Sequence, residues 1–248
     1  MLDQSPSPDA RPDAPTAYAV PWTGWDLVGA LCVGLALGVA GAFVGFLIVR
    51  ALGADPSVTT SVSIASVVIY AALGGAAWGF ALRRRNATFA DAGFRWVGVG
   101  PLLLTLPLVV VLMLATYAVL TVTAGVVGDV PTAQEQVAPG ETSLLPADLL
   151  WLLLAGAIAA PLVEEFIFRG LLFPYLRARK GVAFAVIASA ALFAVLHFVP
   201  PLIPALFVFG IVQALVAYRL KSIYPAIALH ALNNGILLLA VYVTLAEG

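Results

Sequence analysis

Val163-Glu164-Glu165-Phe166-Ile167-Phe168-Arg169 places three charged side chains within six positions of an otherwise apolar region. Residues 149–155 before it and 170–173 after it carry no charge, so the stretch lies inside a hydrophobic segment. An ionisable side chain at membrane depth costs roughly 2.5–3.5 kcal/mol on insertion scales and is by default a functional-site hypothesis. The two adjacent glutamates therefore need partners, and the polar residues of the other apolar segments are the candidates.

The composition is that of an integral membrane protein. Of the 248 residues, 62% are hydrophobic and 10% are charged, and the mean hydropathy is +1.05. A soluble domain carries about 25% charged residues. The net charge of −1 offers no basic stripe for phosphates, so no nucleic-acid partner is expected. Cys32 is the single cysteine of this sequence, so we expect a packing role for it rather than a disulfide or a metal cluster.

The hydrophobic runs predict an all-α fold, a polytopic membrane helical bundle of about seven transmembrane helices, because one span needs about 20 apolar residues. The runs cover about 26–50, 60–82, 98–126, 146–177, 181–198, 203–219 and 223–245. The first run is rich in glycine (Gly34, Gly38, Gly41, Gly45), which suits close helix packing. Residues 26–130 would thus hold the N-terminal transmembrane helices.

The segment before the first run predicts a tail. Residues 1–21 are rich in Pro, Asp and Ser and lack the basic and apolar regions of a signal peptide. Such a composition cannot bury enough apolar surface to fold, so we expect a disordered cytoplasmic tail over residues 1–25. Trp22 and Trp25 are expected to anchor the first span at the membrane interface.

Basic residues predict the orientation. With seven alternating spans, ten Lys and Arg residues fall on one side, and only Arg50 falls on the other when Arg169 is set aside. The polar loop 127–146 has three acidic residues and no Lys or Arg. Because Lys and Arg concentrate in cytoplasmic loops, the N-terminus is predicted to be cytoplasmic and the C-terminus to lie outside.

The two glutamates should have different roles. Glu165 and Arg169 are four residues apart and share one helix face, which favours an ion pair that neutralises Glu165. Glu164 lies about 100° around the helix and has no local partner. The alternative is that both glutamates simply sit at the cytoplasmic interface.

Two histidines supply candidate partners for Glu164. The midpoint between Glu164 and His197 falls at residues 180–181, so an antiparallel hairpin would bring the two level. This requires the fourth helix to continue to about Arg177, which puts both groups about 25 Å from the turn. His230 and Asn234 share a face of the last helix. The alternative for each histidine is a core residue bonded to a carbonyl, and for Asn233 a bond between helices.

Three motifs in this order resemble the CAAX protease and bacteriocin-processing (CPBP) family of glutamate-type, metalloprotease-like intramembrane endopeptidases. They are Glu164-Glu165-x-x-x-Arg169, Phe193-x-x-x-His197 and His230-x-x-x-Asn234. The resemblance covers residues 146–245 as a CPBP-like catalytic transmembrane core. It implies an intramembrane glutamic endopeptidase, CAAX prenyl protease-like, in which Glu164 and His197 activate a water. His230 and Asn234 would then stabilise the oxyanion, and Glu165, Arg169 and Phe193 would support the site.

The resemblance also implies a mechanism without a metal or cofactor. A zinc site built from Glu164 and the two histidines is the alternative, although the sequence has no His-Glu-x-x-His pair. The expected partners are a peptide or protein substrate at the membrane and the lipid bilayer. The composition favours a multi-pass protein of a bacterial plasma membrane. A non-catalytic protein for bacteriocin immunity or partner binding, and a small proton-coupled transporter, remain the other hypotheses.

Overall fold

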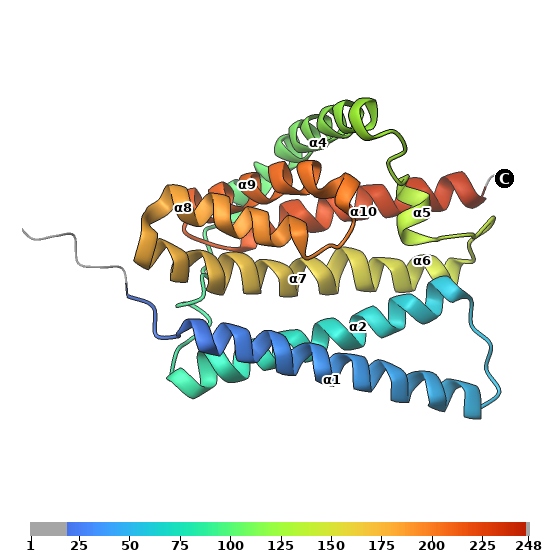
Figure 1. Ribbon diagram of the computed structural model, residues 1–248, viewed down its shortest axis with the longest axis horizontal. Coiled ribbons are helices and arrows are strands. Elements are labelled where there is room, and N and C mark those ends of the chain that lie inside the picture. The colour runs from blue at the N-terminus through green and yellow to red at the C-terminus, as the bar shows by residue number, and fades with distance from the viewer. Residues whose placement is uncertain (1–18, 247–248) are drawn as a thin grey trace, which may run out of the picture.

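The computed structural model describes residues 19–246, and over these residues the chain is an all-helical bundle without strands (Figure 1). Six stretches are long and apolar enough to cross a membrane: Gly24–Ala51, Val58–Arg85, Val99–Val127, Pro146–Val195, Pro200–Leu220 and Tyr224–Ala246. The predicted fold class is therefore confirmed, and the chain is a multi-pass membrane protein.

The helices follow one another along the chain with short connections. In order they are α1 (Gly24–Ala51), α2 (Val58–Ala77), η1 (Trp78–Leu82), η2 (Arg83–Arg85), α3 (Val99–Leu103), α4 (Thr105–Val127), α5 (Ala133–Val137), α6 (Pro146–Leu152), η3 (Leu153–Ala159), α7 (Ala160–Glu165), η4 (Phe166–Leu172), α8 (Phe173–Val195), η5 (Pro200–Leu202), α9 (Ile203–Leu220) and α10 (Tyr224–Ala246). Of the irregular stretches, η1, η3 and η4 are π-helical, whereas η2 and η5 are 3-10 turns.

The fourth hydrophobic stretch is a helical hairpin. Gly181 lies within α8 with φ 82 and ψ 174, a conformation that favours glycine and that breaks the helix there. The second arm turns back along the first (Figure 1), and the Phe193 ring lies 5.3 Å from the Phe168 ring. The turn therefore lies where the midpoint of the motifs predicted it. The two arms account for the difference between six continuous stretches and about seven predicted segments.

The second arm of the hairpin is shorter than predicted. The helix ends at Val195 rather than at 198, and Phe198 takes a left-handed conformation with φ 56. His197 therefore lies in the turn after the helix. At 1.5 Å per residue, the arm from 182 to 195 is about 21 Å long and falls short of a full membrane crossing.

Glycines set the close approach of α1 and α2. A Cβ added at Gly34 or Gly38 would lie 2.8 Å from the Cα of Leu73 or Ile69, respectively, closer than real Cβ atoms come. Gly45 has no such neighbour within 4 Å. Close packing through glycine is thus confirmed for the middle of α1 and does not extend to Gly45.

The start of the first helix is folded onto the bundle. Trp22 is 1% exposed, and its Nε1 donates a hydrogen bond to the Leu171 carbonyl oxygen at 3.0 Å. The expectation that Trp22 anchors the interface is therefore wrong, because its indole N–H is satisfied inside the protein. Trp25 is 82% exposed. Residues 1–18 of the expected tail lie outside the described residues.

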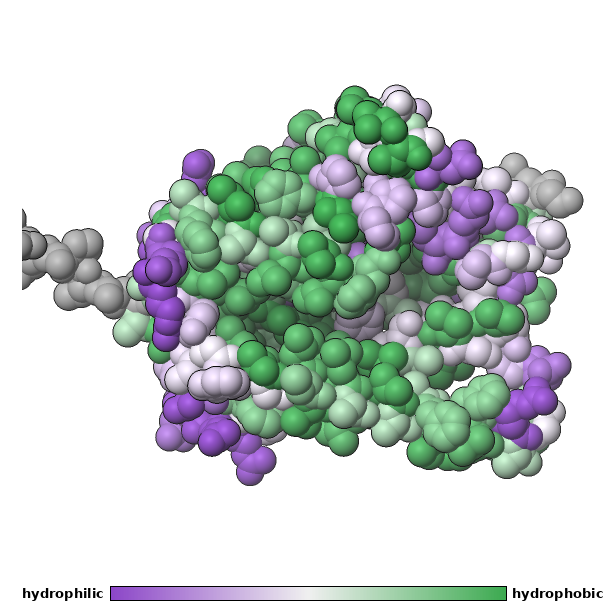
Figure 2. Space-filling model, in the orientation of Figure 1, coloured by the Kyte–Doolittle hydropathy of each residue, from purple (hydrophilic) through white to green (hydrophobic). Residues whose placement is uncertain are grey.

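Polar residues gather at the two ends of the molecule, with an apolar band between them (Figure 2). At one end, Arg85 binds Asp26 at 2.8 Å, and Ser222 Oγ donates to the Arg95 carbonyl at 2.6 Å. At the other end, Thr60 Oγ1 donates to Asp148 at 2.6 Å. The loops rich in Lys and Arg thus share one end, as predicted. Which end faces the cytoplasm stays a prediction.

Candidate active site

The Glu-Glu pair lies on an irregular part of its helix. The short α7 is flanked by the two π-helical stretches η3 and η4. Pro161, near the start of α7, cannot donate a backbone hydrogen bond and disfavours a regular helix before it. Insertions of π-helix frequently occur at functional sites, because they change which side chains face inward. Here Glu165 is fully buried, and the side chain of Glu164 is 14% exposed.

Glu165 and Arg169 form the predicted ion pair. Arg169 Nη1 lies 2.9 Å from Glu165 Oε1, and both side chains are 0% exposed. Arg169 Nη2 also donates to the Gly210 carbonyl at 3.0 Å, and the guanidinium lies 4.7 Å from the Phe193 ring centroid. Because buried charges are tolerable only when paired, this pair ties the helix to α9 and to the hairpin.

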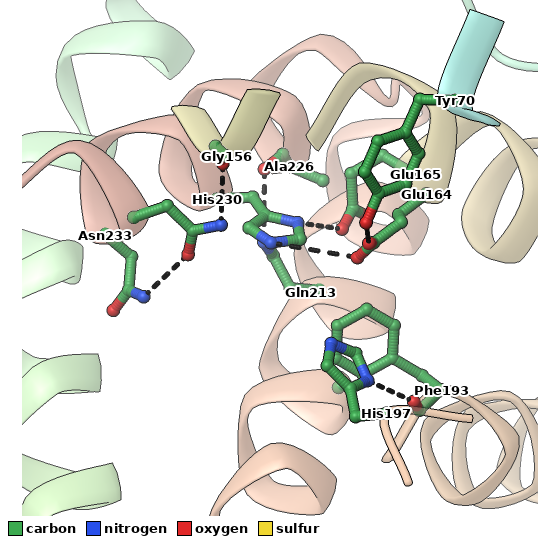
Figure 3. A network of polar contacts seen from close by, with 12 residues as sticks. Tyr70, Gly156, Glu164, Glu165, Phe193, His197, Gln213, Ala226, His230 and Asn233 are labelled. Atoms are coloured by element: carbon green, nitrogen blue, oxygen red, sulfur yellow. Dashed lines mark hydrogen bonds and ion pairs between the residues drawn. The ribbon is translucent and has the colours of Figure 1, made fainter. Parts of the chain in front are cut away.

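His230 bridges the two glutamates. Its Nδ1 lies 2.9 Å from Glu165 Oε1 and donates to it, since an ionised carboxylate only accepts. Its Nε2 lies 3.9 Å from Glu164 Oε2 (Figure 3), which is too far for a direct hydrogen bond. The Phe209 ring, 4.9 Å away, packs edge-on against the imidazole. Glu165 thus orients His230, and His230 faces Glu164.

Tyr70 completes the surroundings of Glu164. Its hydroxyl donates to Glu164 Oε1 at 2.6 Å from α2 (Figure 3). The other oxygen, Oε2, is buried and has no hydrogen-bond partner among the described residues. Tyr70 was not among the predicted site residues, since it lies 94 residues from Glu164 on another helix. A tyrosine within an apolar span could have indicated a polar site nearby, because a buried tyrosine hydroxyl usually has a hydrogen-bond partner.

His197 stands apart from this network. Its Nδ1 donates to the Phe193 carbonyl at 2.7 Å, which leaves Nε2 as an acceptor. No hydrogen bond joins His197 to Glu164 within residues 19–246 (Figure 3). The Phe193 ring lies 4.7 Å from the His197 ring and 6.0 Å from the His230 ring, so it packs against both imidazoles. The structure therefore brings His230, rather than His197, next to Glu164.

Asn234 joins two helices. Its Nδ2 donates to the Gly156 carbonyl of η3 at 2.9 Å, and its Oδ1 accepts from Asn233 Nδ2 at 3.2 Å. The bond between helices that was considered for Asn233 is thus made by Asn234. The amide of Asn234 has two N–H groups, and only one is needed for Gly156.

The described part of the chain contains no group of three or more His, Cys, Asp or Glu residues placed to hold a metal ion. Glu164 and His230 approach each other, but the second histidine of the zinc alternative does not join them. The site of residues 19–246 thus consists of an ion pair, a bridging histidine and a carboxylate with one free oxygen.

The fold and the site define a polytopic membrane protein with a buried carboxylate–histidine site inside its apolar band. Residues 146–236 match the family model described as Rce1-like, type II CAAX prenyl endopeptidase Rce1-like. This match confirms the resemblance to the CPBP family over residues 146–236. All the predicted site residues fall within the matched segment, whereas Tyr70 lies outside it. Neither a curated protein nor a solved structure matches the chain.

Proposed function

We propose that this protein is an intramembrane endopeptidase of the glutamic type, which hydrolyses a peptide bond with a water activated by Glu164. The observation that carries the proposal is the environment of Glu164 Oε2, which is buried, has no described partner and faces His230 Nε2 at 3.9 Å. The match of residues 146–236 to a family of prenyl endopeptidases supports the same reaction class. The substrate would be a peptide or protein at the membrane of a bacterial cell.

Glu164 would act as the general base. The Tyr70 hydroxyl occupies Oε1, so Oε2 is the oxygen that can accept a proton from water. The water oxygen then attacks the peptide carbonyl carbon, and Glu164 returns the proton to the leaving amine. A positioned base of this kind contributes typically about 10²–10⁴-fold to the rate.

His230 and Asn234 would stabilise the oxyanion that forms. With Nδ1 bound to Glu165, a protonated His230 can donate from Nε2 toward the space beside Glu164. The second N–H of Asn234 Nδ2 is the other candidate donor. One oxyanion donor is worth roughly 2.7–4 kcal/mol in other hydrolases. Glu165 and Arg169 act indirectly, because they hold the imidazole in place.

His197 would act through its Nε2. Because its Nδ1 is bound to the Phe193 carbonyl, its Nε2 can accept a hydrogen bond from the attacking water or from a substrate N–H. Phe193 contacts both imidazole rings and would set the spacing between them. This role requires the substrate or the water to occupy the space between the two histidines.

The test compares wild type with Glu164→Gln, which keeps the size of the side chain and removes the base. Membranes from cells that express either form are analysed by comparative peptidomics, and a cleaved peptide is then assayed with the purified proteins. We expect cleavage products only with wild type, and a rate loss of at least about 10²-fold for the variant. Glu135→Gln, at an exposed position of α5, is the control.

Equal cleavage by wild type and Glu164→Gln would refute the proposal. If the variant instead loses no cellular phenotype and wild type produces no cleaved peptide, the alternative of a non-catalytic partner-binding protein is indicated. Retained activity in the presence of a strong chelator would exclude the zinc mechanism.

A further inference from the structure

A cavity lies at the end of the bundle that carries the basic loops. Its volume is about 640 Å³, and it lies between the loop after η2, the first turns of α8 and the connection from α9 to α10. Four basic side chains from these three segments line it: Arg95, Arg177, Arg219 and Lys221. None of them belongs to the site around Glu164.

The walls of this cavity are held together by contacts between the three segments. Ile223 N donates to the Gly93 carbonyl at 2.9 Å, and Ser222 Oγ donates to the Arg95 carbonyl at 2.6 Å. A Cβ added at Gly170 would lie only 2.7 Å from the Ala92 carbonyl oxygen, so the loop after η2 packs directly against the fourth span. The cavity is therefore preformed rather than an opening between mobile loops.

The charge of the cavity favours an anion. Arg177 stacks on Tyr218 with its guanidinium 5.1 Å from the ring centroid, and Arg95 Nε donates to the Ala90 carbonyl at 2.8 Å. Asp91 also lines the cavity, and hydrogen bonds from the backbone N–H and the hydroxyl of Thr88 hold its pKa below the usual value. Arg95, Arg219 and Lys221 by themselves outnumber this one ionised carboxylate, so the cavity carries a net positive charge.

The position of the cavity indicates where the anion comes from. The cavity lies where α9 ends at Leu220 and α10 begins at Tyr224, which is the end of two membrane-spanning stretches. Trp96 and Tyr224, beside it, are 67% and 37% exposed, with their rings 6.4 Å apart. Exposed Trp and Tyr rings are typical of the headgroup level of a membrane. Basic pockets between spans at this level suit lipid phosphates.

We propose that this cavity binds a phosphate ester, supplied by the headgroup of an anionic membrane lipid. The bound headgroup would link the loop 86–98 to the α9–α10 connection and to the fourth span, whose Gly170 follows Arg169. The proposal does not depend on proteolysis, since it concerns a separate cavity.

The test measures binding of short-chain phosphatidylglycerol to the full-length protein in a neutral maltoside detergent by isothermal titration calorimetry. The variant Arg219→Gln/Lys221→Asn removes two cations from the cavity. Both residues are exposed, and asparagine tolerates the left-handed conformation of Lys221, whose φ is 53. The control variant Arg179→Gln/Lys180→Asn removes the same charge from exposed positions at the same end that do not line the cavity.

We expect the cavity variant to weaken binding by about 25-fold, or about five-fold per cation near a phosphate, and the control by less than about two-fold. An equal loss in both variants would overturn the proposal, because the basic end as a whole would then attract the lipid. If inorganic phosphate binds as tightly as the lipid, the proposal that the ligand is a lipid headgroup is refuted, and the cavity is assigned to free phosphate. Unchanged unfolding midpoints of both variants ensure that the comparison reports binding.

Discussion

Replacing Arg169 with methionine should destabilise the protein by about 3–5 kcal/mol, because it leaves the Glu165 carboxylate buried without its counter-ion. Both side chains are 0% exposed, and the ion pair measures 2.9 Å between Nη1 and Oε1. The variant also loses the hydrogen bond from Nη2 to the Gly210 carbonyl, which is worth about 0.5–1.5 kcal/mol. Methionine fills much of the same volume, so the loss reports charge rather than a cavity.

The double variant Glu165→Gln/Arg169→Met separates the ion pair from the packing. It leaves no unpaired charge, and glutamine can still accept a hydrogen bond from His230. We therefore expect it to be more stable than Arg169→Met alone, with a coupling free energy at the upper end of the range of about 0.5–3 kcal/mol that contacting residues show.

The assay is equilibrium unfolding of the purified protein in mixed micelles, titrated with SDS and followed by tryptophan fluorescence. Arg179→Met, at an exposed position, is the control and should unfold like wild type. If Arg169→Met unfolds like wild type, the reasoning from a buried ion pair is refuted. It is also refuted if the double variant loses as much unfolding free energy as the single variants Glu165→Gln and Arg169→Met lose together.

Three further predictions follow from individual contacts. Tyr70→Phe should lower kcat for peptide cleavage by about 10- to 150-fold with little change in KM, since a hydrogen bond to a charged group is worth roughly 1.5–3 kcal/mol. The control variant Tyr117→Phe, at a 71% exposed position, should have the kcat of wild type. Trp22→Phe should lower the free energy of unfolding by about 0.5–1.5 kcal/mol, because the hydrogen bond to the Leu171 carbonyl is lost. The control is Trp25→Phe, at an exposed position, and equal free energies of unfolding for the two variants would contradict this. Gly38→Ala should destabilise the protein by about 1–3 kcal/mol through overpacking against Ile69, whereas Gly45→Ala, which meets no atom within 4 Å, should not.

The order of hydrophobic segments follows from the sequence because each span must be apolar by itself. Lipid surrounds every helix, so hydropathy identifies a span without knowledge of its neighbours. The ion pair of Glu165 with Arg169 is equally local, since positions four apart share a face of any helix. The turn at Gly181 also follows from the sequence, through the spacing of the motifs and the basic residues between them.

The sequence pattern does not predict the contacts between helices that are far apart in the chain. In a membrane bundle both the buried and the lipid-facing sides of a helix are apolar, so the sequence pattern does not define how each helix rotates about its axis. Trp22 illustrates this, because an indole suits the interface and the interior equally well until its N–H finds a partner. Asn233 and Asn234 are neighbours with the same chemistry, and only packing selects Asn234 for the Gly156 carbonyl.

The amino-acid sequence alone is sufficient to predict the spans, the different roles of Glu164 and Glu165, and the candidate residues of the site. Helix packing selects which residues meet: Tyr70 of α2 binds Glu164, and His230 faces it, whereas His197 binds the Phe193 carbonyl. The physical reason is that the π-helical stretches on both sides of α7 change the rotation of the helix, and the early end of the hairpin arm at Val195 places His197 in a turn. Both effects depend on the packing of helices that are far apart in the sequence.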